Sequence, residues 1–359
     1  MKVAIVYDRV NKWGGAERVL LALHELFPKA PMYTSVYNPK TASWAKVFRV
    51  KTSFLQKIPF ASSFHEFFAP FMPLAFSRFS LTKYDVVISV TSEAAKGITV
   101  GKNTIHICYC LTPTRYLWSG YKDYFKNRFF KFFSYPMVFI LRRWDKKIAQ
   151  NPDTFIAISQ EVKKRIKKYY GKDSVVIYPP TNLFPKQKKS PNGLSGYFLV
   201  VSRLVPYKRI DLAIKACNEL KLPLVIIGKG REEVKLKKIA GSTIFFVENL
   251  TDVELSGYYK NCRALIFPGI EDFGLTIIEA QLYGRPVIAY RGGGAMETII
   301  EGKTGLFFNS QKVDSLLDAL KRFEKAKFSP SFVRRQGEKF NAKRFKKELL
   351  TVIRKTKKI

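Results

Sequence analysis

The amino-acid sequence predicts an α/β protein made of two doubly wound domains, each built on a parallel sheet. At 359 residues, the chain is long enough for about two domains, and 47% hydrophobic residues can fill two cores. Short apolar runs alternate with helical segments along the chain, which is typical of strands buried on both faces. The alternation stops at Pro179–Ser195, which is rich in Pro, Lys and Ser. A domain boundary is therefore expected there.

The expected strands fall into two series, one on each side of this boundary. The first series lies at 2–7, 85–90, 104–110, 154–159 and 174–180. The second lies at 197–202, 223–228, 243–248, 264–269, 286–292 and 304–308. Domains over 1–180 and 196–338 follow from this division. We expect a ligand in the cleft between two such domains, because clefts of this kind commonly hold small-molecule sites.

The segment Pro268–Ala289 carries two carboxylates across a strand-to-helix junction. ALIFPG reads as a buried strand, and GLTIIEAQLYG reads as a helix that begins at Gly274. Glu271 then lies at the carboxyl end of a strand, where open α/β sheets place their ligands. Glu279 lies within the helix, and we expect it to point toward the same ligand.

The start of this helix suits an anion. The N–H groups of Gly274, Leu275 and Thr276 have no partner within the helix and favour a phosphate. A carboxylate beside a phosphate would instead accept hydrogen bonds from vicinal hydroxyls of a ribose or a sugar. The alternative is that both glutamates are ordinary solvated residues.

The string from Glu271-Asp272-Phe273-Gly274 to Glu279-Ala280 resembles the Glu-x7-Glu signature of family 4 glycosyltransferases. The resemblance implies the GT-B fold, with two Rossmann-like domains and a last segment, 339–359, that returns to the first domain. It also implies a nucleotide-diphosphate sugar as donor, with GDP-mannose favoured, and transfer with retention and without a metal. Phe273 would belong to the donor site.

A basic pair follows the first strand of the second domain. Arg203 offers a planar fork and Lys208 a point charge, and both suit a diphosphate. Basic pairs are ordinarily solvated, but SRLVPYKRID resembles the family's diphosphate-binding segment. We therefore expect Arg203, Lys208 and the helix start to stabilise the departing diphosphate, which gives them a catalytic role. Glu271, also expected to be catalytic, would orient the donor sugar, and Glu279 would orient the ribose.

Two glycine turns also follow strands. Gly228 and Gly230 make a turn that in this family lies near the nucleotide, although a lone GxG turn is weak evidence. Gly14 and Gly15 would let the backbone approach a phosphate or a sugar closely. WGGAERVL resembles the family's first loop, and Glu17 within it is expected to be a first-turn helix charge.

The segment YCLTPTRYLW departs from the family pattern at Leu111. Related enzymes typically have His-Thr-Pro there, and Leu cannot donate a hydrogen bond or move a proton. A donor-binding relative with weakened turnover is therefore an alternative function. His106, Cys108 and Cys110 alternate along the preceding strand, so they share one face, which favours burial over a metal site.

Charge is the remaining anomaly. There are 63 Lys and Arg against 28 Asp and Glu, a net charge of +35, which attracts polyanions. No zinc finger or other nucleic-acid motif is present, so nucleic-acid binding is the less favoured alternative. An epimerase or a phosphorylase on the same fold is disfavoured by the SRxxxxK and Glu-x7-Glu combination. No nucleophile with an adjacent base is apparent, as a double-displacement mechanism would need.

The aromatic and basic segment Tyr121–Lys147 has two interpretations. It is either a membrane-surface helix or a core helix with a basic outer face, and both remain open. The apolar stretch 63–79 and the basic stretch 321–359 point the same way as the first interpretation. We expect a lipid-linked or polysaccharide acceptor at an anionic membrane surface. With neither a signal peptide nor a spanning segment evident, we expect a cytoplasmic, peripheral location.

Overall fold

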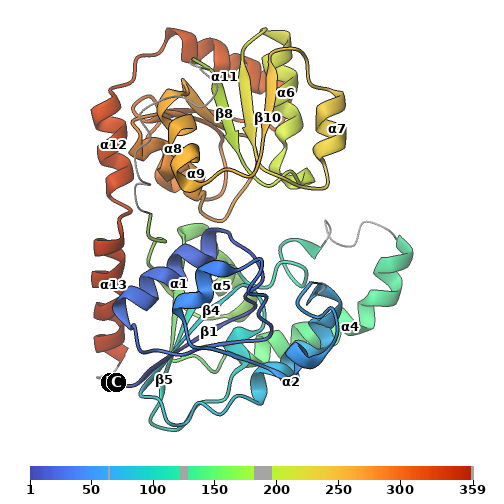
Figure 1. Ribbon diagram of the computed structural model, residues 1–359, viewed down its shortest axis with the longest axis vertical. Coiled ribbons are helices and arrows are strands. Elements are labelled where there is room, and N and C mark those ends of the chain that lie inside the picture. Colours follow the sequence, from blue (N-terminus) through green and yellow to red (C-terminus); the bar gives the residue numbers. More distant parts are fainter. Residues whose placement is uncertain (64, 122–127, 182–195, 357–359) are drawn as a thin grey trace. The chain divides into compact units, whose positions relative to one another are not determined.

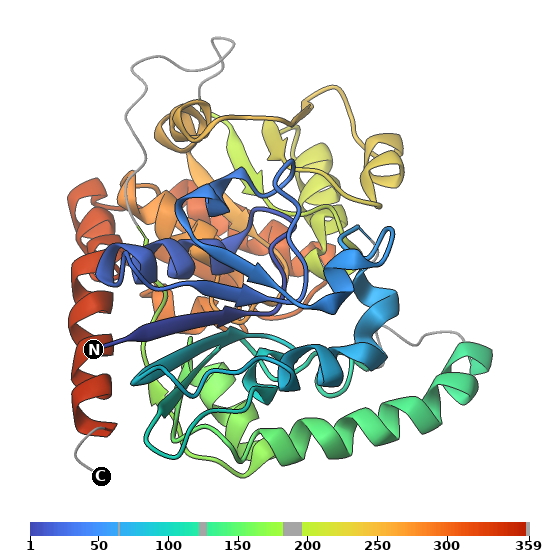
Figure 2. The ribbon, with the colours of Figure 1, turned by 60° about the horizontal axis from the view of Figure 1, so that its bottom comes forward.

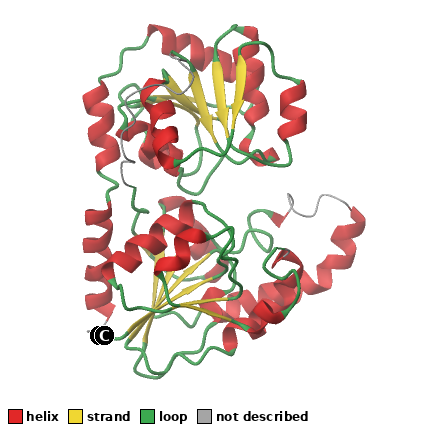
Figure 3. Cartoon of the chain, in the orientation of Figure 1, coloured by secondary structure: helices red, strands yellow, loops and turns green. Residues whose placement is uncertain are grey.

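Two parallel sheets organise the chain, each in its own unit. The structure is a computed structural model that describes residues 1–63, 65–121, 128–181 and 196–356. One unit comprises Met1–Pro180 with Phe345–Ile359, and the other comprises Thr181–Arg344. Figure 3 shows the strands of each unit flanked by helices. Most of the boundary segment expected at Pro179–Ser195 lies outside the described residues.

The first unit has a seven-stranded sheet in the order β3-β2-β1-β4-β5-β6-β7, with every pair parallel. Its strands are β1 (Val3–Tyr7), β2 (Met32–Thr34), β3 (Val50–Thr52), β4 (Val86–Thr91), β5 (Ile105–Cys110), β6 (Thr154–Ala157) and β7 (Val175–Val176). Strand order reverses between β1 and β4. The carboxyl ends of these two neighbours form the switch point at which open sheets bind ligands.

Helices and 3₁₀ turns connect these strands (Figure 1). They are α1 (Gly15–Leu26), η1 (Ser43–Val47), η2 (Phe54–Lys57), η3 (His65–Phe71), α2 (Met72–Ser77), η4 (Ala95–Gly97), α4 (Arg128–Ile148) and α5 (Gln160–Tyr170). Neighbouring residues of β1, such as Ala4, Ile5 and Val6, are all buried. Because their side chains point to opposite faces, the sheet is covered on both sides.

The second unit has a six-stranded parallel sheet in the order β10-β9-β8-β11-β12-β13. Its strands are β8 (Phe198–Val201), β9 (Leu224–Ile227), β10 (Ile244–Val247), β11 (Ala264–Phe267), β12 (Val287–Tyr290) and β13 (Gly305–Phe308). Phe198 and Val200 pack into one core cluster, whereas Leu199 packs into another. Alternate residues therefore feed opposite faces, which confirms the doubly wound α/β class. The switch point lies between β8 and β11.

The helical elements of the second unit begin with a short turn after β8. They are η6 (Pro206–Lys208), α6 (Ile210–Glu219), α7 (Glu233–Lys238), α8 (Asp252–Asn261), α9 (Leu275–Leu282), α10 (Ala295–Thr298), α11 (Val313–Lys325) and α12 (Pro330–Glu338). The sequence missed β2 and β3, which are three residues each. Strands this short leave little periodic signal.

The last helix, α13 (Ala342–Thr356), has most of its length in the first unit. The ring of Phe345 lies 5.7 Å from that of Tyr109, and Thr356 Oγ1 is 3.0 Å from Thr154 Oγ1. Residues 339–344 belong to the second unit instead. None of the described helices combines the length and the hydropathy needed to cross a membrane.

Candidate functional site

The loop between β11 and α9 carries the first predicted carboxylate. Gly274 is the N-cap of α9 with a φ of 90°, a conformation that favours glycine. The helix therefore begins one residue later than expected, at Leu275. Thr276 Oγ1, in the first turn, is buried without a hydrogen-bond partner among the described residues. The loop and helix start thus combine a carboxylate with N–H groups that suit an anion.

Lys208 and Glu271 form an ion pair between the Lys Nζ and the Glu Oε1. Their side chains are 9% and 27% exposed, so water screens the pair only partly. Gly269 explains how the two loops meet: a Cβ there would lie 2.8 Å from Lys208 Cα and 3.0 Å from the Tyr207 carbonyl oxygen. The two charges, expected at different parts of a ligand, form a pair with each other in the structure.

Arg203 lies on the same loop after β8 as Lys208. It is exposed, and its Nη2 donates a hydrogen bond of 2.6 Å to Tyr207 Oη. The guanidinium is thus oriented by a neighbour within the loop and keeps further donors, because a guanidinium has five N–H groups.

The Gly228–Gly230 turn packs against this loop. A side chain at Gly228 would collide with the Ser202 carbonyl, and one at Gly230 would collide with the Leu204 carbonyl. Leu204 N also donates to the Lys229 carbonyl oxygen at 2.9 Å. Close backbone packing therefore explains both glycines, and it holds the loop that carries Arg203.

Glu279 is 4% exposed, deeper than the sequence indicated. Tyr259 Oη donates a 2.7 Å hydrogen bond to its Oε2. Tyr259 in turn stacks on Tyr283, with ring centroids 5.9 Å apart. The carboxylate is therefore oriented from α8 within a mostly aromatic setting.

Phe273 corrects an expectation about the donor site. Its side chain is buried, and its ring packs at 5.6 Å from that of Phe340. The ring is therefore a packing element, and only the backbone of Phe273 is suited to touch a ligand.

A glycine run after β12, not among the expected site residues, packs against the Glu271 loop. Gly294 N donates a hydrogen bond to the Glu271 carbonyl oxygen at 2.9 Å. Gly293 has a φ of 58°, and a Cβ there would collide with the same carbonyl oxygen. A Cβ at Gly294 would collide with the Phe273 backbone. The signal was RGGG directly after the β12 run, the same strand-then-glycine pattern that singled out Gly228.

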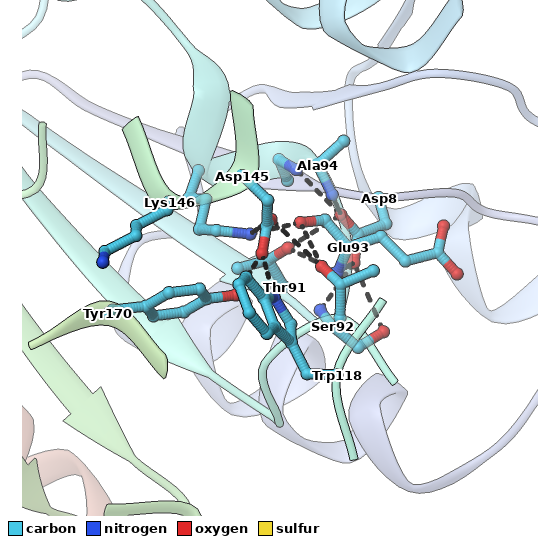
Figure 4. A network of polar contacts seen from close by, with 12 residues as sticks. Asp8, Thr91, Ser92, Glu93, Ala94, Trp118, Asp145, Lys146 and Tyr170 are labelled. Atoms are coloured by element: carbon cyan, nitrogen blue, oxygen red, sulfur yellow. Dashed lines mark hydrogen bonds and ion pairs between the residues drawn. The ribbon is translucent and has the colours of Figure 1, made fainter. Parts of the chain in front are cut away.

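The first unit has a polar network at its own switch point, shown in Figure 4. Asp8 follows β1 and accepts hydrogen bonds from Thr91 Oγ1 and from several backbone N–H groups after β4. These groups belong to Ser92, Glu93, Ala94 and Ala95, at 2.7–3.0 Å. Burial raises the pKa of Asp8 despite these bonds. The carboxylate therefore ties together the ends of the two strands that flank the switch point.

An ion pair lies beside this carboxylate. Arg9 Nη1 is 2.5 Å from Glu93 Oε1, and both side chains are mostly buried. Arg9 Nε is buried with no hydrogen-bond partner among the described residues. The amino-acid sequence gives no local signal for this pair, because only the parallel pairing of β1 with β4 brings residues 9 and 93 together.

The Gly14–Gly15 turn differs from a phosphate-binding loop because a carboxylate lies beside it. Glu17 is buried, its Oε1 accepts from Tyr7 Oη at 2.9 Å, and burial raises its pKa. Glu17 therefore lies in the first turn of α1, as expected, but it is buried. A Cβ at Gly14 would lie 3.2 Å from Glu17 Oε2. A carboxylate already beside Gly14 favours an uncharged sugar over a phosphate there.

Leu111 continues the ladder of β5, with its N–H donating to the Thr91 carbonyl oxygen at 2.8 Å. His106 is buried upstream, 2.8 Å from Ser89 Oγ, and burial lowers its pKa to about 3. It therefore packs inside the sheet and cannot replace a histidine at position 111. Cys108 and Cys110 are buried beside it.

Comparisons with known proteins match both halves of the chain to glycosyltransferase families. Residues 13–183 match the family model "Glycosyltransferase Family 4", and residues 184–340 match "Glycosyl transferases group 1". A GDP-mannose-dependent alpha-(1-6)-phosphatidylinositol monomannoside mannosyltransferase of Mycolicibacterium smegmatis is 26% identical over 216 residues, 52% of this chain and 56% of that protein. An uncharacterized glycosyltransferase of Methanocaldococcus jannaschii is 27% identical over 190 residues, 50% of this chain and 52% of the relative.

The chain spans little more than half the length of these relatives. Among solved structures, Anabaena HepE in complex with UDP and glucose has a TM-score of 0.73 at 19% identity, covering 98% of this chain and 99% of HepE. That likeness extends over both units and concerns the fold. With its two halves matched in turn by these family models, the chain belongs to the family 4 glycosyltransferases.

Proposed function

We propose that the protein transfers a hexosyl group from a nucleotide-diphosphate sugar to a lipid-linked or polysaccharide acceptor at a membrane surface, with retention. The observation that carries the proposal is the Lys208–Glu271 pair, with Arg203 on the same loop and the start of α9 adjoining it. These groups supply positive charge for a diphosphate and a carboxylate for sugar hydroxyls.

GDP-mannose is the favoured donor, supported by the name of the mycobacterial relative, which is GDP-mannose-dependent. In this scheme Lys208 moves from Glu271 to the diphosphate, and Glu271 then accepts hydrogen bonds from the donor sugar. Arg203 binds the diphosphate with its planar fork. The Tyr259 bond orients Glu279 toward the ribose diol, since an ionised carboxylate can accept several hydrogen bonds.

The transfer step exchanges one bond at the anomeric carbon. The bond to the diphosphate oxygen breaks with its electron pair, and a bond to the acceptor oxygen forms on the same face. The acceptor proton passes to the departing diphosphate oxygen. The basic groups stabilise the charge that develops on that oxygen, which is where electrostatic catalysis is most effective.

A thermal-shift screen with GDP, UDP, ADP and their sugar conjugates tests donor binding. We expect the largest shift with GDP-mannose, and its loss in Arg203→Ala and Glu279→Ala. Arg263→Ala is the matched control, because Arg263 directly precedes β11 and lies at the amino end of that strand, whereas Arg203 and Glu271 follow the carboxyl ends of β8 and β11. Wild-type protein that gives no shift with any sugar nucleotide would refute the proposal.

Leu111 supports a second candidate, a relative that binds donor but turns over slowly. An apolar side chain stands at the end of β5, beside the switch point. Donor binding without measurable transfer, at any acceptor concentration, would favour this candidate.

A further inference from the structure

Helix α4 exposes an apolar surface where a surface helix is ordinarily polar. Phe132 is 76% exposed, and Phe133 and Ile140 are each 64% exposed. Tyr135, Met137 and Phe139 are exposed as well. We call these six residues the α4 ridge. The outer face of α4 over residues 132–140 is therefore apolar, which favours the interpretation of this segment as a membrane-surface helix.

The other face of α4 is fixed to the first unit. Val138 and Leu141 are buried in a cluster with Leu117. Arg142 Nε donates to the Leu117 carbonyl oxygen at 2.6 Å, and its guanidinium lies 5.6 Å from the centre of the Trp118 ring. The helix therefore packs on the first unit through one face, and the ridge is the face that remains exposed.

A buried charge anchors the carboxyl end of the helix (Figure 4). Asp145 accepts hydrogen bonds from Lys96 Nζ at 2.6 Å, Trp118 Nε1 at 2.7 Å and Tyr170 Oη at 2.8 Å. Lys96 and Asp145 are almost fully buried. Separating such a pair would leave a buried charge without its partner, which is costly. The pair therefore fixes this end of α4 to the first unit. Figure 2 shows the other end extending past the remaining elements of the first unit.

The charges of α4 suit an anionic partner. Asp145 is the helix's one acid, and it is engaged with Lys96. Arg143, Lys146 and Lys147 are exposed near the carboxyl end of the ridge. Aromatic and aliphatic side chains beside unopposed basic residues are what interfacial membrane helices present to anionic lipid.

A second exposed apolar segment lies beside α4. Phe67 in η3 is 80% exposed, and Phe71 and Leu74 are exposed in the same stretch. The partly buried Trp144 of α4 packs against the cluster that contains Met72 of α2. Figures 1 and 2 both place α2 alongside α4. Exposed apolar groups therefore gather around one region of the first unit.

We propose that the first unit docks on an anionic bilayer surface through the α4 ridge, with η3 and α2 as a second contact. This docking rests on the proposed function and deepens it, since a lipid-linked acceptor is presented at such a surface. A net charge of +35 favours lipid over a protein partner, because an anionic bilayer attracts the whole basic surface as well as the ridge.

Vesicle co-sedimentation tests the inference, with neutral phosphatidylcholine vesicles and vesicles that also contain phosphatidylserine. We expect the full chain to bind the anionic vesicles, and Phe133→Ser/Ile140→Ser to bind about tenfold more weakly. Phe245→Ser is the matched control, since Phe245 is an exposed phenylalanine of β10 in the second unit. Binding that the double substitution leaves unchanged, or that the control weakens equally, would overturn the inference.

Two further measurements separate docking from a folding defect in the variants and from a failure of the proposed enzymatic function. Hydrogen exchange on the wild-type chain should show amides 132–140 protected by anionic vesicles, and no change there contradicts docking. A nucleotide-sugar thermal shift without vesicle binding would overturn the docking inference alone. Self-association that depends on the ridge, without vesicle binding, would assign the surface to a second copy of this chain.

Discussion

Lys208 bonds to Glu271 within the second unit, joining a cation that follows β8 to a carboxylate that follows β11. These two strands are neighbours that flank the switch point of their sheet. The pair therefore occupies the position at which open α/β sheets bind ligands. Each charge neutralises the other, so a ligand that engages both must carry an anionic part and a hydroxyl-bearing part.

Removing one partner should impair both stability and donor binding. Lys208→Gln leaves Glu271 without its cation in a partly buried place, which costs about 1–3 kcal/mol of unfolding free energy. Lys237→Gln is the control, because Lys237 pairs with Glu233 at the surface and its substitution should change stability much less. Urea denaturation of both variants measures the difference, and equal losses would contradict the role of the buried pair.

Gly294→Ala should displace the Glu271 loop, because the new Cβ meets the Phe273 backbone. Overpacking of this kind costs about 1–3 kcal/mol, and the nucleotide-sugar thermal shift should shrink with it. Gly302→Ala is the control: its φ is 74° with open space around it, so it should cost only about 1 kcal/mol of conformational strain. An unchanged ligand shift in Gly294→Ala would show that the loop does not hold the donor.

His106 should make the first unit sensitive to acid. Its pKa is about 3 in the folded chain against 6.5 ordinarily, so the unfolded state binds the proton more readily. Stability is therefore fully present above pH 6.5 and falls as pH drops toward 3, by about 2 kcal/mol at pH 5. His106→Asn should remove this slope.

The measurement is the free energy of unfolding of both proteins from pH 8 to pH 5. Asp8 and Glu17 have raised pKa values, which act in the opposite direction. They are present in both proteins, so the difference between the two curves isolates His106. Parallel curves would contradict the assignment.

Asp145→Asn should destabilise the first unit by about 3–5 kcal/mol, because Lys96 then stays buried and charged without its partner. Combining Asp145→Leu with Lys96→Met removes both charges and should recover part of this loss. Thermal unfolding of the single and double variants gives the comparison. A single variant as stable as the wild type would show that the other bonds to Lys96 suffice.

Leu111→His tests whether the missing imidazole limits turnover. Position 111 lies at the end of β5 next to Thr91, and general acid–base groups typically contribute a factor of about 10²–10⁴. If the absence limits the rate, donor consumption should rise by at least about tenfold. No gain in rate, with donor binding intact, removes Leu111 as an explanation for slow turnover.

Local signals predicted much of the fold and part of the candidate site. Apolar runs marked the longer strands, and the glycines and charges after them marked Arg203, Lys208 and Glu271. The longest helix, α4, was recognised as aromatic and basic, but which face packs depends on neighbours such as Leu117. That information lies in contacts between segments far apart in the chain.

The amino-acid sequence alone determined the doubly wound class and the loops that carry Arg203, Lys208 and Glu271, because periodicity and strand-end chemistry are local properties. The family was indicated by the resemblance of a local motif, Glu-x7-Glu. Tertiary structure decided that Lys208 bonds to Glu271, that Glu279 and Glu17 are buried, and that Phe273 packs inward. It also brought Arg9 to Glu93 and left the α4 ridge exposed. These contacts and the burial of these side chains depend on strand pairing and packing between residues far apart in the sequence.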